Sequence, residues 1–262
     1  MTAAPPSDPV VEQARAYFEE FAADYDQAAI ESGWMPNRLL EDALSLVGGV
    51  DRAADLACGT GSSLAVVRKA WPDADLVGVD VSASMLGRAR VRIADARFVR
   101  ADLRAFADGV HEPFDLVTVI GGFEFTDQLP ELLAAVRRLV RPGGHLVFTF
   151  EPVMSGWAPQ ASRVETNLGS NGLELTTFRS ERSEVTEGFA GWTLLGDRLV
   201  AAYLRDGLPT VYGWLHYRRP GSPAHGRPAR SRSRGRTGQF PSSELIENPL
   251  LLPPELPSPE GR

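Results

Sequence analysis

Acidic side chains close two predicted strands that follow a glycine-rich loop, an arrangement suited to binding a nucleoside. The loop is "DLACGTGSS", residues 55–63, and it breaks a short apolar run. Asp80 ends the next apolar run, "LVGVD", and Asp102 ends "FVRAD". A carboxylate at position 80 can accept both hydroxyls of a ribose, and one at 102 suits the exocyclic amine of an adenine. Met85, one turn into the helix after Asp80, can pack on the purine face.

The loop itself does not have the sequence of a phosphate-binding loop. Glycines between a strand and a helix let a ligand approach the backbone and the free amides of the helix N-terminus. A Walker loop needs Lys and then Ser or Thr after its last glycine, whereas Gly61 precedes two serines. The dinucleotide fingerprint needs a third glycine, which is missing after Gly59 and Gly61. A carboxylate placed like Asp80 is used by both dinucleotide and adenosyl-sulfonium enzymes, but the missing third glycine and the acid at 102 disfavour an NAD-dependent oxidoreductase.

Strands and helices alternate through the middle of the chain, which predicts an α/β fold with a parallel sheet. The strands are apolar on both sides, as expected when helices cover both faces. Strands are predicted at 52–57, 74–80, 96–102, 114–122 and 145–152, and helices at 62–71, 82–93 and 128–140.

The two ends of the chain are predicted to differ from this central domain, which we place at residues 50–218. Residues 1–9 are rich in Pro and Ala, and 219–262 in Pro, Ser and Arg, so both are expected to be disordered. An N-terminal helical segment, 10–49, has predicted helices at 10–26 and 37–47. The stretch 152–178 has no clear period and is expected to be a substrate lid. A short helix near 180–190 and a hairpin around "RDGLP", between strands at 192–204 and 210–219, complete the domain.

Composition narrows the class of protein further. The 262 residues carry a net charge of −7, which argues against a nucleic-acid binder. The single cysteine, Cys58, lies within the loop and is interpreted as a small buried residue. Neither a signal peptide nor a membrane span is recognisable, so a cytoplasmic protein without membrane partner is expected. No His or Cys pair has metal-ligand spacing, so no metal site is predicted. A monomer or homodimer is expected.

Five motifs in order resemble class I S-adenosylmethionine-dependent methyltransferases. They are "DLACGTGSS", "LVGVDVSASML", "FVRADLRAF", "FDLVTVIGG" and "LVRPGGHLVFTFEP". The resemblance covers about residues 50–218. It implies a doubly wound, seven-stranded Rossmann-like sheet of order 3-2-1-4-5-7-6 with an antiparallel seventh strand, and S-adenosyl-L-methionine as cofactor. The chain departs from the common loop at Ala57-Cys58, where many members have a glycine.

The same resemblance implies roles for individual residues. Two N-terminal tyrosines resemble lid residues at the methionine end of the cofactor, and Asp55 is expected near its ammonium. The loop approaches the methionine portion, Asp80 holds the ribose, and neighbouring residues flank the adenine. The implied cofactor-binding set is Tyr17, Tyr25, Asp55, Ala57, Gly59, Gly61, Asp80, Val81, Met85, Ala101, Asp102, Leu103, Ile120 and Gly121.

The acceptor is less well defined than the cofactor, and a small molecule is expected to be methylated on O, N or carboxylate. Phe123, Phe125 and Trp157 are the predicted substrate-contacting residues. A hydroxyl acceptor requires a general base, for which Glu124, Glu151 and His216 are candidates, whereas a carboxylate acceptor needs none. "GGFEF" stands where nucleobase amino-methylases have an Asn/Asp-Pro-Pro-Tyr/Phe motif, which disfavours a nucleobase amine. A protein that binds the cofactor without methyl transfer, as a pericyclase or regulator, remains an alternative.

Overall fold

The computed structural model describes residues 8–34, 36–154, 163–166, 175–205, 208–221 and 245–246. Trp157, most of the expected substrate lid and most of the expected disordered tail therefore lie outside the described residues.

The N-terminal segment folds into three short helices instead of the two predicted. They are α1 (Pro9–Phe21), α2 (Tyr25–Glu31) and α3 (Pro36–Leu44). Asp8 caps α1 by accepting a hydrogen bond from the amide of Val10 at 2.9 Å. The predicted helix over 10–26 is interrupted because a turn, closed by the Asp24 amide on the carbonyl of Phe21 at 3.1 Å, separates α1 from α2. The turn brings Phe18 and Phe21 edge-to-face with Tyr25.

Five parallel strands form the middle of the sheet, as the alternation of apolar runs predicts. They are β1 (Arg52–Leu56), β2 (Asp75–Asp80), β3 (Arg97–Arg100), β4 (Phe114–Val119) and β5 (Val140–Pro152). The helices between them are α4 (Ser62–Ala70), α5 (Ala83–Arg92), α6 (Leu103–Gly109) and α7 (Leu129–Leu139), and a 3-10 turn, η1 (Phe123–Phe125), follows β4. β5 begins earlier than predicted, because residues 140–144 continue the strand through a bulge opposite β4.

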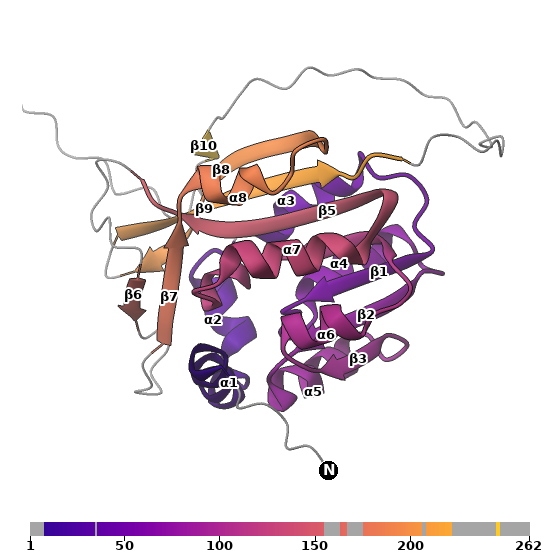
Figure 1. The fold of residues 1–262 in the computed structure, drawn as a ribbon. Coiled ribbons are helices and arrows are strands. Elements are labelled where there is room, and N and C mark those ends of the chain that lie inside the picture. Colours follow the sequence, from indigo (N-terminus) through magenta and orange to yellow (C-terminus); the bar gives the residue numbers. More distant parts are fainter. Residues whose placement is uncertain are drawn as a thin grey trace, which may run out of the picture.

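The sheet ends in the predicted hairpin. β8 (Thr193–Arg205) and β9 (Leu208–Arg218) pair antiparallel, and β9 is antiparallel to β5. The order β10-β8-β9-β5-β4-β1-β2-β3 contains the expected 3-2-1-4-5-7-6 arrangement, which is confirmed (Figure 1). The additional strand, β10 (Leu245–Ile246), lies within the segment expected to be disordered and pairs parallel with β8.

The segment before the hairpin is more regular than predicted. β7 (Leu175–Ser180) pairs antiparallel with β6 (Arg163–Thr166) and adds to the end of β5. The short helix α8 (Arg182–Glu187) lies where it was expected, with a capping box between Glu181 and Glu184.

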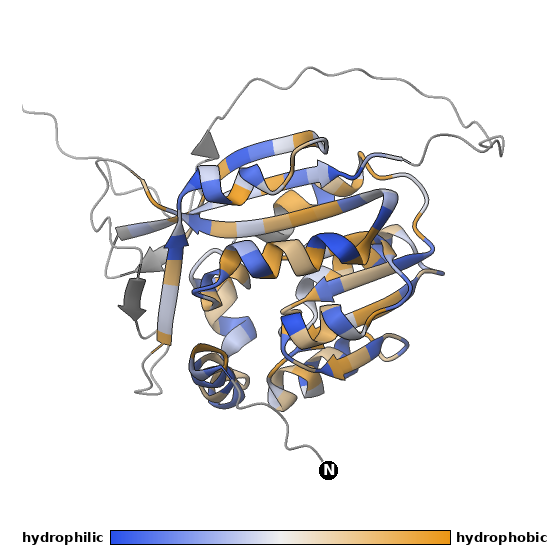
Figure 2. Ribbon diagram, viewed as in Figure 1, coloured by the Kyte–Doolittle hydropathy of each residue, from blue (hydrophilic) through white to orange (hydrophobic). Residues whose placement is uncertain are grey.

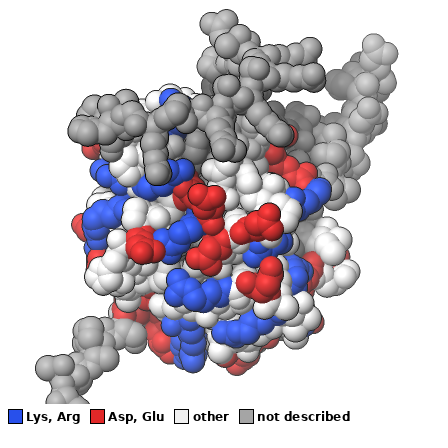
Figure 3. Space-filling model, turned by 90° about the vertical axis from the view of Figure 1, so that its right-hand side faces the viewer, with Lys and Arg blue, Asp and Glu red and all other residues white. Residues whose placement is uncertain are grey.

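Hydrophobic residues concentrate where helices meet the sheet, and they form a separate cluster on each face (Figure 2). One cluster packs α6 and α7 on the sheet through residues such as Phe106 and Val136. The other packs α3 and α4 through Leu40 and Leu64. On the face shown in Figure 3, the basic and acidic side chains of the described residues are interspersed, without a continuous area of one sign. The covered sheet thus leaves the carboxyl ends of its strands as the place for a site.

Candidate functional site

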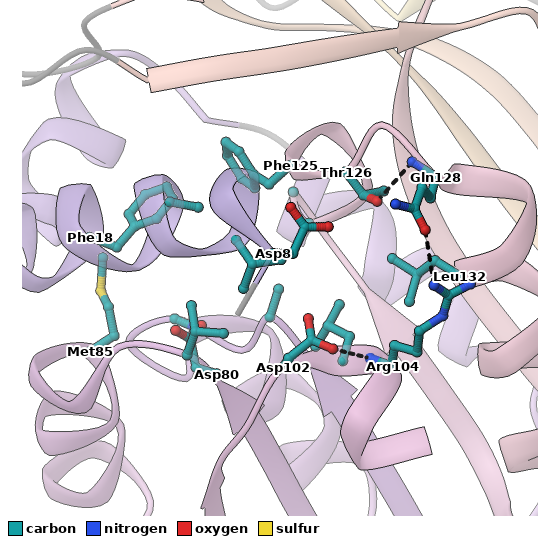
Figure 4. Close-up of a pocket in the computed structure, with 18 of the residues that line it drawn as sticks. Asp8, Phe18, Asp80, Met85, Asp102, Arg104, Phe125, Thr126, Gln128 and Leu132 are labelled. Carbon is teal, nitrogen blue, oxygen red and sulfur yellow. Dashed lines mark hydrogen bonds between the residues drawn. The ribbon is translucent and has the colours of Figure 1, made fainter. Parts of the chain in front are cut away.

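A cavity of about 260 Å³ lies where the carboxyl ends of β1, β2 and β4 meet helix α1 (Figure 4). Its wall includes ten of the residues that the resemblance assigned to cofactor or substrate, and nine others. The lining residues are Asp8, Val11, Ala14, Phe18, Tyr25, Ala57, Gly59, Asp80, Val81, Met85, Asp102, Leu103, Arg104, Gly121, Gly122, Phe125, Thr126, Gln128 and Leu132.

The glycine-rich loop reaches the cavity through a backbone that glycine favours. Gly59 and Gly61 have φ of 52° and 82°, and Ala57 shares this left-handed region at 54°. The Cβ of Ala57 fills the position that a side chain on Gly122 would need, 2.7 Å away. Gly61 begins α4 and lies against α5, where a Cβ would meet Ala89 at 3.2 Å, so it shapes the loop without lining the cavity.

Asp80 is held in place by the loop and by the start of the next helix. Its Oδ2 accepts a hydrogen bond from the Gly59 amide and its Oδ1 one from the Ser82 amide, both at 2.9 Å. Burial raises the pKa of Asp80, against the lowering effect of these amides. Each carboxylate oxygen retains a further lone pair, so Asp80 can still accept hydroxyl groups of a ligand in the cavity.

Asp55 is a buried carboxyl group with an unused acceptor. The hydroxyl of Thr118 donates to its Oδ1 at 2.6 Å, whereas Oδ2 has no hydrogen-bond partner among the described residues. Burial raises the pKa of Asp55 to about 7, although the bond from Thr118 acts in the opposite direction. Asp55 is not among the residues that line the cavity, but its charge acts on the hydroxyl of Tyr25, which does line it. Its free oxygen fits a cationic ammonium group.

The part of the cavity between Phe18 and Met85 is apolar and fits the flat face of a purine. Met85 from α5 and Phe18 from α1 point toward one another across it (Figure 4). Asp102 caps α6 by accepting the amides of Arg104 and Ala105 on one oxygen, Oδ1, at 2.9 and 3.1 Å. Its other oxygen makes none of these capping bonds, so Asp102 can accept an amine as predicted.

Sequence reasoning missed the wall that α1 and the residues near α7 contribute. Val11, Ala14 and Phe18 belong to the helix predicted over 10–26, but their position in the cavity wall was not predicted. Arg104 bridges to the side-chain oxygen of Gln128 at 3.0 Å and brings the only basic group among the lining residues. No sequence signal identified these residues as part of a site, because they do not belong to a recognisable binding motif.

Several predicted site residues do not line the cavity. Tyr17 is fully buried and packs edge-to-face on Phe18 and Phe21. Ile120 and Phe123 belong to the two hydrophobic clusters. Ala101 is half-buried and donates its amide to the Asp80 carbonyl at 3.1 Å. Each of these residues is next in sequence to a residue that lines the cavity, and adjacent side chains of a helix or strand point in different directions.

The two glutamate candidates share a buried polar cluster and are not among the residues that line the cavity. Tyr212 donates its hydroxyl to Oε1 of Glu124 at 2.7 Å and lies 3.4 Å from Oε1 of Glu151. Arg179 forms an ion pair with Glu151 at 3.3 Å. A Cβ on Gly121, which lines the cavity, would lie 3.6 Å from Oε1 of Glu124, so this carboxylate adjoins the wall.

His216 does not take part in the site. It is fully buried and lies 2.9 Å from the imidazole of His145. Burial lowers the pKa of His216 to about 3 and that of His145 to about 4, so both are neutral near pH 7. His216 contacts another histidine and is not among the residues that line the cavity, which disfavours the predicted role as a general base.

Negative charge dominates around the cavity. Burial raises the pKa of the Tyr25 hydroxyl, and the neighbouring carboxylates of Glu124 and Asp80 raise it further. With Asp102 and Asp8 also in the wall and Arg104 as the one basic lining residue, the site favours a cationic ligand.

The described residues offer neither a metal site nor a membrane-spanning helix. No group of three His, Cys, Asp or Glu side chains within the described part of the chain could hold a metal ion. Among the described helices, none has both the length and the apolar character needed to cross a bilayer.

Comparison with known proteins agrees with this geometry. Residues 53–144 match the family described as a methyltransferase domain. Trans-aconitate 2-methyltransferase of Azoarcus sp. (strain BH72) is 38% identical over 107 residues, which are 41% of this chain and 39% of that protein. The chain thus matches about two fifths of the length of this curated relative.

Solved structures extend the similarity to most of the fold. Magnesium protoporphyrin IX methyltransferase from Synechocystis PCC 6803 with bound SAM aligns with a TM-score of 0.56 at 14% identity, over 82% of this chain and 100% of that one. The DhpI–SAH complex aligns with a TM-score of 0.58 at 21% identity, over 82% and 99%. At such identities the likeness establishes the fold alone.

Proposed function

We propose that the chain is a class I S-adenosylmethionine-dependent methyltransferase that methylates a small-molecule acceptor. The match of residues 53–144 to a methyltransferase domain and the similarity to trans-aconitate 2-methyltransferase support this proposal. The observation that supports the proposal most is the position of Asp80 and Asp102. Asp80 ends β2, Asp102 follows the adjacent strand β3 as the N-cap of α6, and both line one cavity together with the loop residues Ala57 and Gly59.

The residues of the cavity fit each part of the cofactor. Asp80 would accept the ribose hydroxyls, and Met85 with Val81 and Leu103 would enclose the adenine, whose amine would donate to Asp102. The free oxygen of Asp55 would accept the ammonium of the methionine portion. The surplus of carboxylates favours the cationic form of the ligand over its neutral, demethylated product.

Methyl transfer in this cavity requires mainly alignment. The cofactor, when bound, supplies a methyl group on a positively charged sulfur, so acid catalysis of the leaving group is unnecessary. The wall residues would hold donor and acceptor in line, which contributes several kcal/mol to lowering the barrier. Phe18, Phe125 and Leu132 would exclude water.

We further propose that the acceptor carries an O–H or N–H group whose proton passes to Glu124. This carboxylate adjoins Gly121 at the cavity wall, and its bond from Tyr212 fixes its orientation. Phe125, which lines the cavity, is the candidate for packing on the acceptor, whereas Phe123 supports the core. Glu151 would help to orient Tyr212.

Further proposals concern the lid, the compartment and the oligomeric state. We propose that residues 10–49 act as a helical lid on the domain at 50–218. We also propose that the protein acts in the cytoplasm as a monomer or homodimer without a nucleic-acid partner, in line with its net charge of −7.

The proposal is tested by turnover with cofactor that carries a labelled methyl group. The purified chain is incubated with the small-molecule fraction of a bacterial cell extract, and label is followed into extractable products. We expect labelled product with wild type, and roughly 100-fold less with Glu124→Gln if that residue takes the proton. Binding of the cofactor without any labelled product from diverse acceptors would support the alternative of a non-transferring protein.

A further inference from the structure

One side chain of the lid contacts the glycine-rich loop directly. The hydroxyl of Thr60 donates to Oδ1 of Asp26, in α2, at 2.6 Å. Arg92, at the end of α5, donates from Nη2 to Oδ2 of Asp26 at 2.8 Å. It also donates from Nη1 to the carbonyl and the hydroxyl oxygen of Thr60, at 2.7 and 2.8 Å. Asp26, Thr60 and Arg92 therefore form a closed network, here called the clasp.

The clasp lies next to two features of the cavity. Tyr25, which precedes Asp26, lines the cavity, as does Gly59, which precedes Thr60. Thr60 stands between Gly59 and Gly61, both in the left-handed region, so the loop has little intrinsic preference for the observed conformation. The hydrogen bonds to the Thr60 side chain therefore restrain the loop through contacts within the protein, without any contact to a ligand.

We propose that the clasp is a positioning network that couples the lid to the loop and slows release of the bound cofactor. This inference rests on the proposed function, since it assigns the cavity to that cofactor. Opening the lid requires the bonds from Thr60 and Arg92 to Asp26 to break, and a loop ordered by ligand presents Thr60 in the conformation that Asp26 binds. Lid closure and ligand binding then stabilise each other.

The burial of the three clasp residues determines how strongly the clasp can slow release of the cofactor. Thr60 is 1% exposed, whereas the side chains of Arg92 and Asp26 are 32% and 34% exposed. An ion pair at such exposure contributes little by itself, so the effect depends on the bonds to the buried Thr60.

Other contacts between the lid and α5 avoid the loop and provide a matched control. Arg88, one turn before Arg92, donates to the carbonyl of Ala23 at 2.6 Å. Glu19 accepts the hydroxyl of Ser82 at 2.7 Å. Arg88→Gln removes a lid contact of similar type on the same helix but leaves Thr60 untouched.

Hydrogen exchange in the absence of ligand tests the clasp independently of the proposed function. The amides of Gly59 and Gly61 are hydrogen-bonded, to Asp80 and to the Cys58 carbonyl. We expect Asp26→Ala and Arg92→Gln to speed their exchange about tenfold, as loss of one bond to a charged group predicts. Exchange within twofold of wild type in both variants, or an equal effect of Arg88→Gln, would overturn the inference.

Dissociation of S-adenosylhomocysteine tests the coupling. We expect Asp26→Ala and Arg92→Gln each to release it about tenfold faster, and the double variant to be no faster than the single ones, because the residues act as one network. A double variant whose dissociation rate rises by the product of the two single effects would contradict a shared network. Asp26→Asn, which keeps an acceptor for Thr60, should show a smaller change and guards against a folding defect in the alanine variant. Absence of binding by wild type would contradict the proposed function, while hydrogen exchange would still decide on the clasp.

Discussion

Asp55 and His216 lie in one row of the sheet, and burial acts on their pKa values in opposite directions. The row runs from Asp55 through Thr118 and Val147 to His216, each residue paired with the next. Burial raises the pKa of Asp55 to about 7 and lowers that of His216 to about 3. In both cases the neutral form is favoured, because a charge loses hydration inside the protein.

The difference between the two groups lies in what they can do near neutral pH. His216 and its partner His145 are neutral well above their pKa values and are bonded to each other. Asp55 is close to its midpoint and has an oxygen without a partner among the described residues. A buried group near its midpoint beside a cavity can respond to a charged ligand, whereas one far from its midpoint only packs.

The largest effect is expected at Asp80, a carboxylate that lines the cavity. Asp80→Ala should weaken binding of S-adenosylhomocysteine about 100-fold, or about 3 kcal/mol, because it removes the ribose acceptor and the support of the Gly59 amide. Calorimetric titration measures this, with His216→Phe as the control expected to bind like wild type. Equally weak binding of S-adenosylhomocysteine by the two variants would contradict the assignment of Asp80 to the site and of His216 to the core.

The pH dependence of binding should single out Asp55. An ammonium ligand requires ionised Asp55, so below pH 7 the free protein must release a proton on binding, and the affinity falls toward tenfold per pH unit. Above about pH 7 this contribution is flat. Asp55→Asn should bind more weakly at pH 8 and lose the slope. A slope that persists in this variant would assign the proton to another group.

The buried histidines and Asp55 should contribute with opposite signs to the change of the unfolding free energy in acid. Between about pH 6.5 and 4 the unfolded histidines bind protons that the folded pair does not, so each lowers the unfolding free energy by up to about 1.4 kcal/mol per pH unit. Asp55 acts in reverse, because the folded form is protonated below pH 7 and the unfolded form only below about 4.

Urea denaturation at pH 7, 6 and 5 separates these contributions. His216→Phe should flatten the loss of stability in acid, and Asp55→Asn should steepen it. Changes of the same sign in both variants would contradict the comparison.

The sequence was sufficient to predict the sheet because its strands are continuous apolar runs between helices. The hairpin was also predictable from Asp-Gly between two strand-like runs. The break between α1 and α2, the pairing of β6 with β7 and the β10 strand were not predictable, since they depend on contacts between distant segments.

The same limit applies within the candidate site. Gly59, Asp80 and Asp102 were predictable because motif spacing fixes their place at strand ends. Neighbours in short helical turns were not: Phe125 lines the cavity whereas Phe123 is in the core. Similarly, Phe18 lines it and Tyr17 does not, because helix rotation is set by packing.

The most direct test is an equilibrium titration of the full chain with S-adenosylhomocysteine at pH 8, compared with NAD under the same conditions. The account predicts saturable binding at one site per chain in the micromolar range, and no saturable binding of NAD. Absence of binding of S-adenosylhomocysteine at millimolar concentration, or preference for NAD, would contradict the assignment of the cavity.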